Sequence, residues 1–528
     1  MEGRRPRYNP GGFRRGAQSN MRIPGAVEHW DRLSPQETRA LQERKLRDFL
    51  RTQVLAFSPH YRRLFQEHGL DPSSIRTLDD LRRIPFTTKK DIVPRAGEPE
   101  RARDLVLQPT PQLIRRHWGK ATLLGMMLEK RFRGREHVLE QIGREYRPAQ
   151  LFFTTGRSSA PVGFALTLYD LEVLKITGGR ILDVIGIDTF QDRAVSLFPY
   201  APHLAFWQVA YCGLSRGVLT FNTGGGRIFS TEAMLDIIER VKPTLLAGIP
   251  GYVYHLLRRA TADGRAFPQL RLVALGGDRV TPALRERIVT LLHDMGAREP
   301  RVVSVLGFTE ARICWAECPA RDGRETGFHV YPDLGVFEVI DPRTGENVPE
   351  GETGELVYTP LEGRGSVVLR YRTGDIAHGG LTTEPCPGCG RRVQRLSCDL
   401  RRESNVSEFH LSKVKGTLVD LNLLPGVIQG VPEVEEWQLV LRKKDDDPLE
   451  LDEILLFVSL RDGADRDAVC RRLVDAVRRE SEVTLNEVQV LPLPEMLERL
   501  KMETSVKEVR ILDLRNSPAP RAATPARA

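Results

Sequence analysis

Between residues 151 and 375, short apolar runs alternate with longer segments of helical pattern. The runs at residues 243–247, 270–275 and 302–306 are each bounded by glycine or proline. Runs of this length, separated by helices, predict buried strands of largely parallel sheets. The sequence therefore predicts an α/β core with mixed or parallel sheets in this part of the chain.

Positive charge is concentrated at the two ends of the chain. Of the net charge of +8, residues 1–22 contribute +5 and residues 516–528 contribute +2, so the body is nearly neutral. A solvated basic tail is favoured over a nucleic-acid arm, and no nucleic-acid partner is expected. The sequence has no apolar run of about 18 residues and no apolar stretch near its start, so we expect neither a membrane span nor a secretory signal. The expected location is cytoplasmic.

Three polar segments follow one another along the core, at residues 154–161 (TTGRSSAP), 306–310 (LGFTE) and 371–376 (YRTGDI). The first is rich in hydroxyls, the second ends in a carboxylate, and the third presents a carboxylate after a Thr-Gly turn. ATP needs N–H and hydroxyl donors at its phosphates, a carboxylate for Mg2+, and a polar grip on its ribose. In this order the segments indicate an ATP site.

These motifs resemble those of the adenylate-forming enzymes, the acyl-CoA synthetases and their relatives. The segment at residues 84–91 (IPFTTKKD), after an amino-terminal helix, is similar to the phenylacetate-CoA ligase branch. The resemblance covers most of residues 35–515. It implies a large multi-subdomain N-terminal domain and a smaller, mobile α/β C-terminal domain. We expect a disordered basic tail at residues 1–22, a large ATP- and acyl-binding domain at 23–400, a small lid domain at 401–515 and a disordered tail at 516–528.

The phosphate loop departs from the family pattern, Thr-Ser-Gly-Thr-Thr-Gly-Lys-Pro. Ser159 takes the place of the second glycine and Ala160 that of the lysine, which removes one positive charge, although Arg157 is placed to supply one. We expect the loop to lie between the strand at residues 151–153 and a helix. Its expected nucleotide-binding residues are Thr154, Thr155, Gly156, Arg157, Ser158 and Ser159.

The later motifs imply further roles by resemblance. Thr309 is expected at the α-phosphate and Glu310 at Mg2+, after Gly307 and Phe308. Asp375 is expected to accept hydrogen bonds from the ribose. The remaining expected nucleotide contacts are Gly276, Gly277 and Asp278 on the adenine side and Arg402 at the hinge.

The end of the chain, residues 506–515 (VKEVRILDLR), resembles the family's Gly-Lys-x-x-Arg ending. Lys507 falls on the catalytic lysine. Attack of a carboxylate on a phosphate brings two anions together, and a delivered ammonium group stabilises that charge.

The acyl pocket is expected to include Phe206 and Trp207 together with Ala247, Gly248, Ile249 and Pro250. Aromatic and small residues suit an aryl or other apolar acid, but such residues could equally belong to the core.

Cys386 and Cys389 form a C-x2-C knuckle, which commonly offers two thiolates to Zn2+. Cys318 and His329 are the expected partners, with Cys398 as a competitor. A structural zinc is favoured over a bare turn.

The sequence therefore predicts an AMP-forming acid-thiol ligase that uses ATP, Mg2+ and CoA. Two alternatives stay open: transfer of the acyl group to a carrier protein or an amine, and a nucleotide-binding homologue with weakened catalysis. A homodimer is also left open.

Overall fold

The structure is a computed structural model. It describes residues 25–95, 97–98, 100–154, 161–226, 228–320, 323–402, 406–412, 415–421, 423–444, 451–481, 484–502 and 508–515, with only the backbone for residues 406–420. The predicted tails, the phosphate-loop residues from Thr155 to Ala160 and the predicted catalytic Lys507 lie outside the described residues.

A six-stranded sheet forms the centre of the large domain, with the order β4-β3-β5-β6-β7-β8. All neighbours are parallel except the last pair. The strands are β3 (Arg193–Pro199), β4 (Leu219–Gly224), β5 (Leu245–Gly248), β6 (Leu272–Gly276), β7 (Arg301–Gly307) and β8 (Cys314–Ala316). The apolar runs predicted as strands are β5, β6 and β7, and the predicted α/β class is confirmed.

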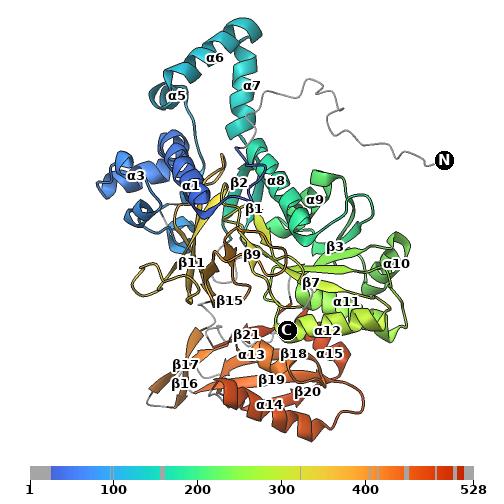
Figure 1. Ribbon diagram of the computed structural model, residues 1–528. Helices are drawn as coiled ribbons and strands as arrows, with labels where there is room; N and C mark the ends of the chain where they lie inside the picture. The colour runs from blue at the N-terminus through green and yellow to red at the C-terminus, as the bar shows by residue number, and fades with distance from the viewer. Residues whose placement is uncertain are drawn as a thin grey trace, which may run out of the picture.

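Helices cover both faces of this sheet (Figure 1). Alternate residues of β3 point to opposite sides, so Ala194 joins one buried cluster with α8 and α9, whereas Val195 joins another with α10, α11 and α12. A parallel sheet buried on both faces needs continuous apolar strands, as found here. These helices are α8 (Leu168–Ile185), α9 (Leu204–Arg216), α10 (Thr231–Val241), α11 (Pro250–Ala262) and α12 (Pro282–Asp294).

Smaller antiparallel sheets complete the large domain. One has the order β10-β11-β12-β15, another β13-β14-β9, and β1 pairs with β2. Their bounds are β1 (Pro148–Phe153), β2 (Gly163–Thr167), β9 (Phe328–His329), β10 (Gly335–Ile340), β11 (Gly354–Pro360), β12 (Tyr371–Ala377), β13 (Leu381–Thr382), β14 (Arg395–Leu396) and β15 (Leu400–Arg402). Because β15 still pairs with β12, the chain remains in this sheet as far as Arg402.

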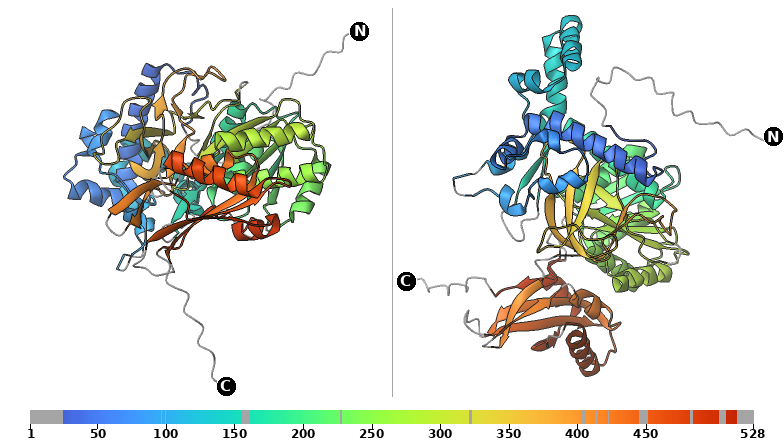
Figure 2. Two further views of the ribbon diagram at one scale, coloured as in Figure 1. Left: turned by 90° about the horizontal axis from the view of Figure 1, so that it is seen from below. Right: turned by 60° about the vertical axis from the view of Figure 1, so that its left-hand side comes forward.

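The amino-terminal part is helical. α1 begins with a capping box in which Ser34 and Glu37 accept hydrogen bonds from each other's backbone N–H groups. The helices here are α1 (Pro35–Phe49), α2 (Leu55–Phe57), α3 (Pro59–Glu67), α4 (Lys89–Ile92), α5 (Pro111–His117), α6 (Lys120–Arg133) and α7 (Arg135–Tyr146). The last three project from the large domain (Figures 1 and 2).

The small domain lies at the opposite end of the molecule from α6 (Figure 1). Its sheet has the order β20-β19-β18-β21, and α14 places Val469, Leu473 and Val477 in its core. Its elements are β16 (Val406–Ser412), β17 (Lys415–Asp420), α13 (Leu424–Gln429), β18 (Val434–Lys443), β19 (Asp452–Leu460), α14 (Arg466–Ser481), β20 (Glu487–Val490), α15 (Leu493–Leu500) and β21 (Ile511–Asp513).

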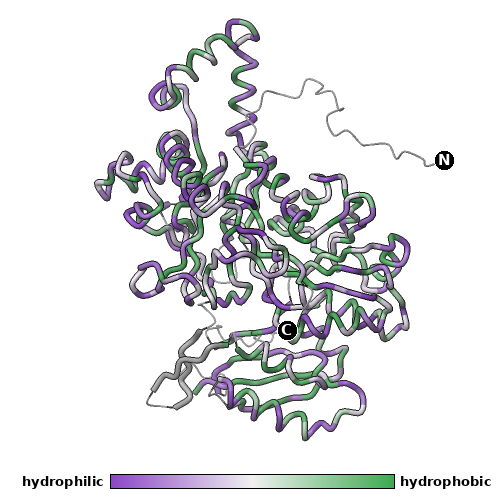
Figure 3. Tube along the Cα trace, viewed as in Figure 1, coloured by the Kyte–Doolittle hydropathy of each residue, from purple (hydrophilic) through white to green (hydrophobic). Residues whose placement is uncertain are grey.

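The two domains touch through α15. Its buried residues Met496 and Leu500 belong to the same apolar cluster as residues of α11 and α12. Hydropathy follows this organisation, with apolar segments along the central strands and mixed segments on the projecting helices (Figure 3). Among the described residues, no helix has the length and apolar character needed to cross a bilayer.

Candidate functional site

Three neighbouring parallel strands end in glycines at one edge of the central sheet. β5, β6 and β7 end at Gly248, Gly276 and Gly307. The carboxyl ends of parallel strands meet at the same edge, which is where ligands bind in open α/β sheets. The topology therefore brings together the predicted acyl segment at 247–250 and the predicted nucleotide segments at 276–278 and 307–310.

The glycines allow the tight backbone paths at this edge. Gly277 has a φ of +83°, which favours glycine, and a Cβ added at Gly307 would collide with Cys314 Sγ. Asp278 accepts a hydrogen bond from the backbone N–H of Arg279 at 2.9 Å. Arg279 in turn forms a 2.7 Å ion pair with Asp399, which holds the β6 loop next to β15.

Glu310 is held by a buried tyrosine of the second sheet. The Tyr371 hydroxyl donates a hydrogen bond to Glu310 Oε1 at 2.7 Å. Burial raises the pKa of Tyr371, and the adjacent Glu310 charge raises it further, so the phenol stays a donor. A half-buried carboxylate oriented in this way is a suitable Mg2+ ligand when phosphate oxygens supply the other contacts.

The predicted phosphate loop lies between two strands, β1 and β2, and not between a strand and a helix as predicted. After residue 160 the chain forms β2, which pairs with β1, and α8 begins only at Leu168. The apolar sequence of β2 completes a hairpin before Thr167 caps α8. Thr154 closes the base of the loop, because its N–H donates to the Val162 carbonyl and its Oγ1 accepts from the Val162 N–H, both at 3.0 Å.

The base of this loop touches the β7 motif. Thr309 Oγ1 donates to the Phe153 carbonyl at 3.4 Å, and His203 Nδ1 lies 2.7 Å from the same oxygen. Thr309, Glu310 and Thr154 are therefore gathered around one end of the β1–β2 hairpin.

Asp375 lies inside a strand, not on a turn that ends one, which corrects the predicted Thr-Gly turn. β12 continues through Gly374, whose φ of +72° accompanies an irregular register opposite β11. Three residues of β12 stand opposite one residue of β11 here, and such bulges redirect side chains. Asp375 Oδ1 pairs with Arg402 Nε at 3.0 Å, so the expected ribose carboxylate and the expected hinge arginine are neighbours.

The predicted acyl residues divide between two elements. Phe206 and Trp207 are half-buried on α9 and form edge contacts with each other and with Tyr200. Ala247 and Gly248 end β5, Ile249 caps α11, and Pro250 is its first residue.

The carboxyl-terminal segment of the small domain reaches this acyl edge. The buried Glu508 side chain packs so closely on Gly251 that any side chain at position 251 would collide with it. Arg510 is anchored by a 2.7 Å ion pair with Glu436. The described residue next to Lys507 therefore contacts the first turn of α11.

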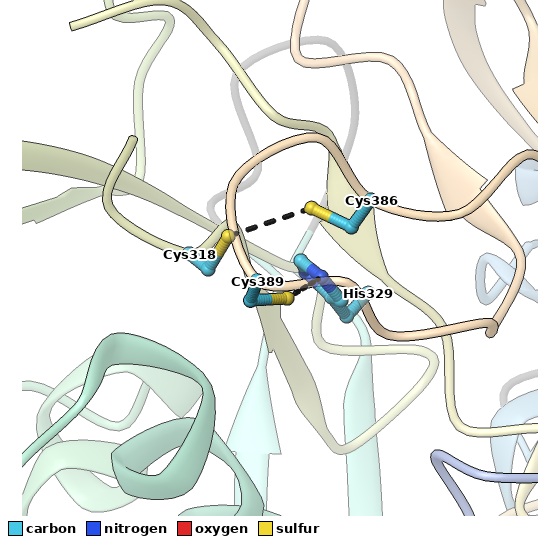
Figure 4. A group of neighbouring side chains, drawn as sticks. All are labelled: Cys318, His329, Cys386 and Cys389. Atoms are coloured by element: carbon cyan, nitrogen blue, oxygen red, sulfur yellow. Dashed lines mark hydrogen bonds between the residues drawn. The ribbon is translucent and has the colours of Figure 1, made fainter. Parts of the chain in front are cut away.

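The cysteine and histidine residues predicted as metal ligands come together from three segments (Figure 4). The ligand atoms of Cys318, His329, Cys386 and Cys389 all lie within 4.8 Å of one another. The Cys318 and Cys386 sulfurs are 3.5 Å apart, and His329 Nε2 is 3.2 Å from Cys389 Sγ. Cys398 is outside the group and its thiol faces Glu317.

The surroundings of this cluster match a metal site. His329 Nδ1 lies 3.3 Å from the Ala316 carbonyl, which leaves Nε2 directed at the sulfurs. Hydrogen bonding from Cys318 lowers the pKa of both Cys386 and Cys389. A Cβ at Gly388 would lie 2.9 Å from Cys318 Sγ, so the knuckle requires glycine there.

Sequence reasoning assigned no role to Tyr371 or Thr87. Thr87 exchanges backbone hydrogen bonds with Arg370 and Arg372 at 3.1 and 2.9 Å, so the amino-terminal segment lies alongside the start of β12. Thr87 belongs to the segment at residues 84–91 and Tyr371 to that at 371–376, so their pairing joins segments nearly 300 positions apart.

Known proteins are similar to most of this chain. Residues 105–361 match the family described as AMP-binding enzyme. The chain is 26% identical over 424 residues to the phenylacetate-coenzyme A ligase of Thermus thermophilus. The aligned residues cover 78% of this chain and 80% of that protein. The resemblance predicted from the motifs is confirmed.

Solved structures share the fold. A 2-hydroxyisobutyryl-CoA ligase in its post-adenylation state superposes with a TM-score of 0.71 and 18% identity, over 92% of this chain and 91% of that one. The same ligase in its thioesterification state gives 0.57 with equal identity and coverage.

Proposed function

We propose, from the premise that this chain carries an AMP-binding enzyme domain at residues 105–361 in an adenylate-forming fold, that it activates a carboxylic acid with ATP and transfers the acyl group to CoA. The observation that carries this proposal is the junction of the β7 motif with β12, through the 2.7 Å hydrogen bond between Tyr371 and Glu310. That contact places the proposed metal carboxylate beside the strand that carries the proposed ribose carboxylate, Asp375.

In the first half-reaction, a carboxylate oxygen of the acid attacks the α-phosphorus of ATP. The new bond gives the acyl-adenylate, and the bond from the α-phosphorus to pyrophosphate breaks. In this proposal Thr309 donates its hydroxyl hydrogen to an α-phosphate oxygen instead of to the Phe153 carbonyl, and Asp375 accepts hydrogen bonds from the ribose hydroxyls. Glu310 would hold Mg2+, whose charge offsets that of the phosphates.

In the second half-reaction, the sulfur of CoA attacks the acyl carbon, the bond to AMP breaks, and the thiol proton leaves to solvent. Ligases of this kind use a rotation of the small domain between the two steps. Contact between Glu508 and Gly251 supports delivery of the adjacent Lys507 to the acyl edge during adenylation. The half-buried aromatic pair Phe206 and Trp207 supports an aryl or other apolar acid.

The same proposal includes a structural zinc held by Cys318, His329, Cys386 and Cys389. Bonds of about 2.3 Å in a tetrahedral site separate sulfur ligands by about 3.8 Å, close to the spacing of this cluster. The four residues connect β8 to the β9-β13-β14 sheet, so the metal would fix that sheet to the central one. Metal analysis of the purified protein should find one zinc per chain, and its absence from a fully folded protein would contradict the site.

The reaction is tested by measuring pyrophosphate release from MgATP with a panel of aryl and fatty acids, with and without CoA. Mass spectrometry of the products identifies the acceptor. A CoA thioester is expected. A thioester formed only with a carrier protein, or an amide product, would show that the acyl acceptor is a carrier protein or an amine and not CoA. ATP binding without pyrophosphate release for any acid would overturn it.

Lys507 is tested by separating the two half-reactions. Lys507→Ala should lose adenylation but still convert a supplied acyl-adenylate to the thioester, whereas the nearby Lys501→Ala should retain both steps. Equal loss of both steps in Lys507→Ala would count against the assignment.

A further inference from the structure

The helices α5, α6 and α7 form an arm that extends away from the rest of the large domain (Figures 1 and 2). No residue of α6 is buried. Its residues Leu124, Met127, Leu128 and Phe132 are each at least 50% exposed, and Phe132 reaches 80%. Single exposed leucines are common on protein surfaces, but four large apolar side chains exposed on one helix of 14 residues form a contiguous apolar patch.

The exposed apolar residues share one side of α6. Their spacing of three, one and four positions places them within about half of the helix circumference, since each residue turns the helix by about 100°. Leu123 and Met126, on the other side, are half-buried and pack against the core of the amino-terminal part. The outward apolar side is therefore additional to the one that attaches α6 to the protein.

The arm is also strongly basic. Residues 111–135 carry seven cations and one carboxylate, a net charge of +6, whereas the rest of residues 23–515 has a net charge of about −5. Within the described part of the chain, none of the seven cations forms an ion pair with a carboxylate. They are Arg115, Arg116, Lys120, Lys130, Arg131, Arg133 and Arg135.

We propose that α6 binds the surface of an anionic lipid bilayer. Helices that lie in the interface of a membrane combine Leu, Met or Phe on one side with Lys and Arg, whose long stems let their charges reach the headgroups. The positive arm on an otherwise slightly acidic body would orient the molecule toward anionic lipid. With 14 residues, α6 is too short to span a bilayer, so it would lie on the surface.

The position and charge of the arm disfavour two other occupants. The arm lies opposite the small domain, so an acyl-carrier protein seated on it could not deliver its thiol to the edge where Glu508 meets Gly251 (Figure 1). A second copy of the arm would bring two charges of +6 together. A membrane at this end leaves the site and the small domain facing the solution.

The test is sedimentation of the full-length protein with vesicles of phosphatidylcholine alone or with 30% phosphatidylglycerol. We expect about tenfold more bound protein with the anionic vesicles, and most of it released by 0.5 M salt. The variant Met127→Ser/Leu128→Ser/Phe132→Ser should lose about tenfold in binding, as should Lys130→Gln/Arg131→Gln/Arg133→Gln. Pyrophosphate release in the absence of vesicles should be unchanged in both and shows that they fold.

Three controls make the result specific. Phe190→Ser removes an equally exposed phenylalanine from the body, at 85% exposure, and should bind vesicles as the parent protein does. Removal of residues 1–22, which carry +5, should leave most of the binding. Size-exclusion chromatography should give the same molecular mass for the parent protein and the arm variants.

Equal binding to neutral and anionic vesicles would overturn the proposal. So would arm variants that bind as the parent protein does, or binding lost with residues 1–22 alone. A parent dimer that the arm variants convert to monomers would show that α6 is an interface between copies of this chain and would also overturn it.

Discussion

The two ends of the large domain are built in opposite ways. At the end that meets the small domain, Glu310, Asp375 and Thr154 come from separate segments and are held by short hydrogen bonds or an ion pair to other elements. At the far end, α6 is one continuous segment in which no side chain is buried. At the first end, contacts with other elements fix the positions of individual side chains. At the second end, the sequence defines only the apolar and basic character of the surface.

The largest effect should come from Glu310→Gln, which keeps the shape of the side chain but removes its charge. If this carboxylate holds Mg2+ at the phosphates, kcat/KM for acid-dependent pyrophosphate release should fall by about 100-fold or more. Thermal unfolding should shift little, because the glutamine oxygen can still accept from Tyr371. Glu299→Gln is the matched control, since Glu299 is 84% exposed and distant from the site. Near-normal turnover of Glu310→Gln would remove this residue from the proposed site.

A second test uses the cysteine cluster, whose residues, like those of the proposed nucleotide site, come from separate segments and are held by contacts with other elements. Cys386→Ser should reduce zinc affinity by at least 100-fold and destabilise the protein by about 2–5 kcal/mol, since it leaves the remaining ligands and the β9-β13-β14 sheet without their link. Denaturant unfolding and metal content measure the two effects. Cys470→Ser, on the small domain, should change neither, and equal stabilities of the two variants would argue against a structural metal.

The hydrogen bond to Glu310 gives a smaller expected effect. Tyr371→Phe removes one donor to a charged acceptor, which is worth about 1.5–3 kcal/mol, so adenylation should slow by about 10- to 150-fold and require more Mg2+. Tyr358→Phe is the matched control, because the buried Tyr358 hydroxyl has no hydrogen-bond partner among the described residues. A Tyr371→Phe enzyme with parent-like dependence on Mg2+ would show that this contact is structural only.

The smallest effect is expected at the arm. Phe132→Ser should change the free energy of unfolding by less than about 0.5 kcal/mol, since its side chain is already in water. Phe57→Ser, which places a hydroxyl in a fully buried position, should cost several kcal/mol. Urea unfolding of the pair measures the difference. A large loss of stability in Phe132→Ser would contradict the exposure of this side chain and show that it packs against another part of the protein.

The sequence could predict the parts of the site that lie within one segment. The glycine-ended strands β5, β6 and β7 have an apolar pattern that required a parallel sheet, and parallel strands place their carboxyl ends together. The C-x2-C knuckle also lies within one segment, whereas Cys318 and His329 are distant in the sequence and had to be chosen by residue type from seven cysteines and eleven histidines.

The contacts between distant segments could not be predicted. The hairpin after β1 was predicted as a strand-to-helix turn because Gly163–Thr167 is short and only its pairing with β1 makes it a strand. The Tyr371 hydrogen bond depends on how two sheets pack, which no local pattern encodes. For α6, the sequence does not tell which apolar residues face the protein, so the exposure of its outer side follows only from the contacts of Leu123 and Met126 with the core.

The most direct test of the site is acid-dependent exchange of labelled pyrophosphate into ATP in the absence of CoA. This assay reports adenylation alone and is independent of the acyl acceptor. We predict exchange with at least one aryl or apolar acid, a loss of about 100-fold or more in Glu310→Gln, and parent-like exchange in the α6 variant Met127→Ser/Leu128→Ser/Phe132→Ser. Exchange that survives in Glu310→Gln but fails in the α6 variant would contradict the proposal that adenylation takes place at the end of the large domain that meets the small domain.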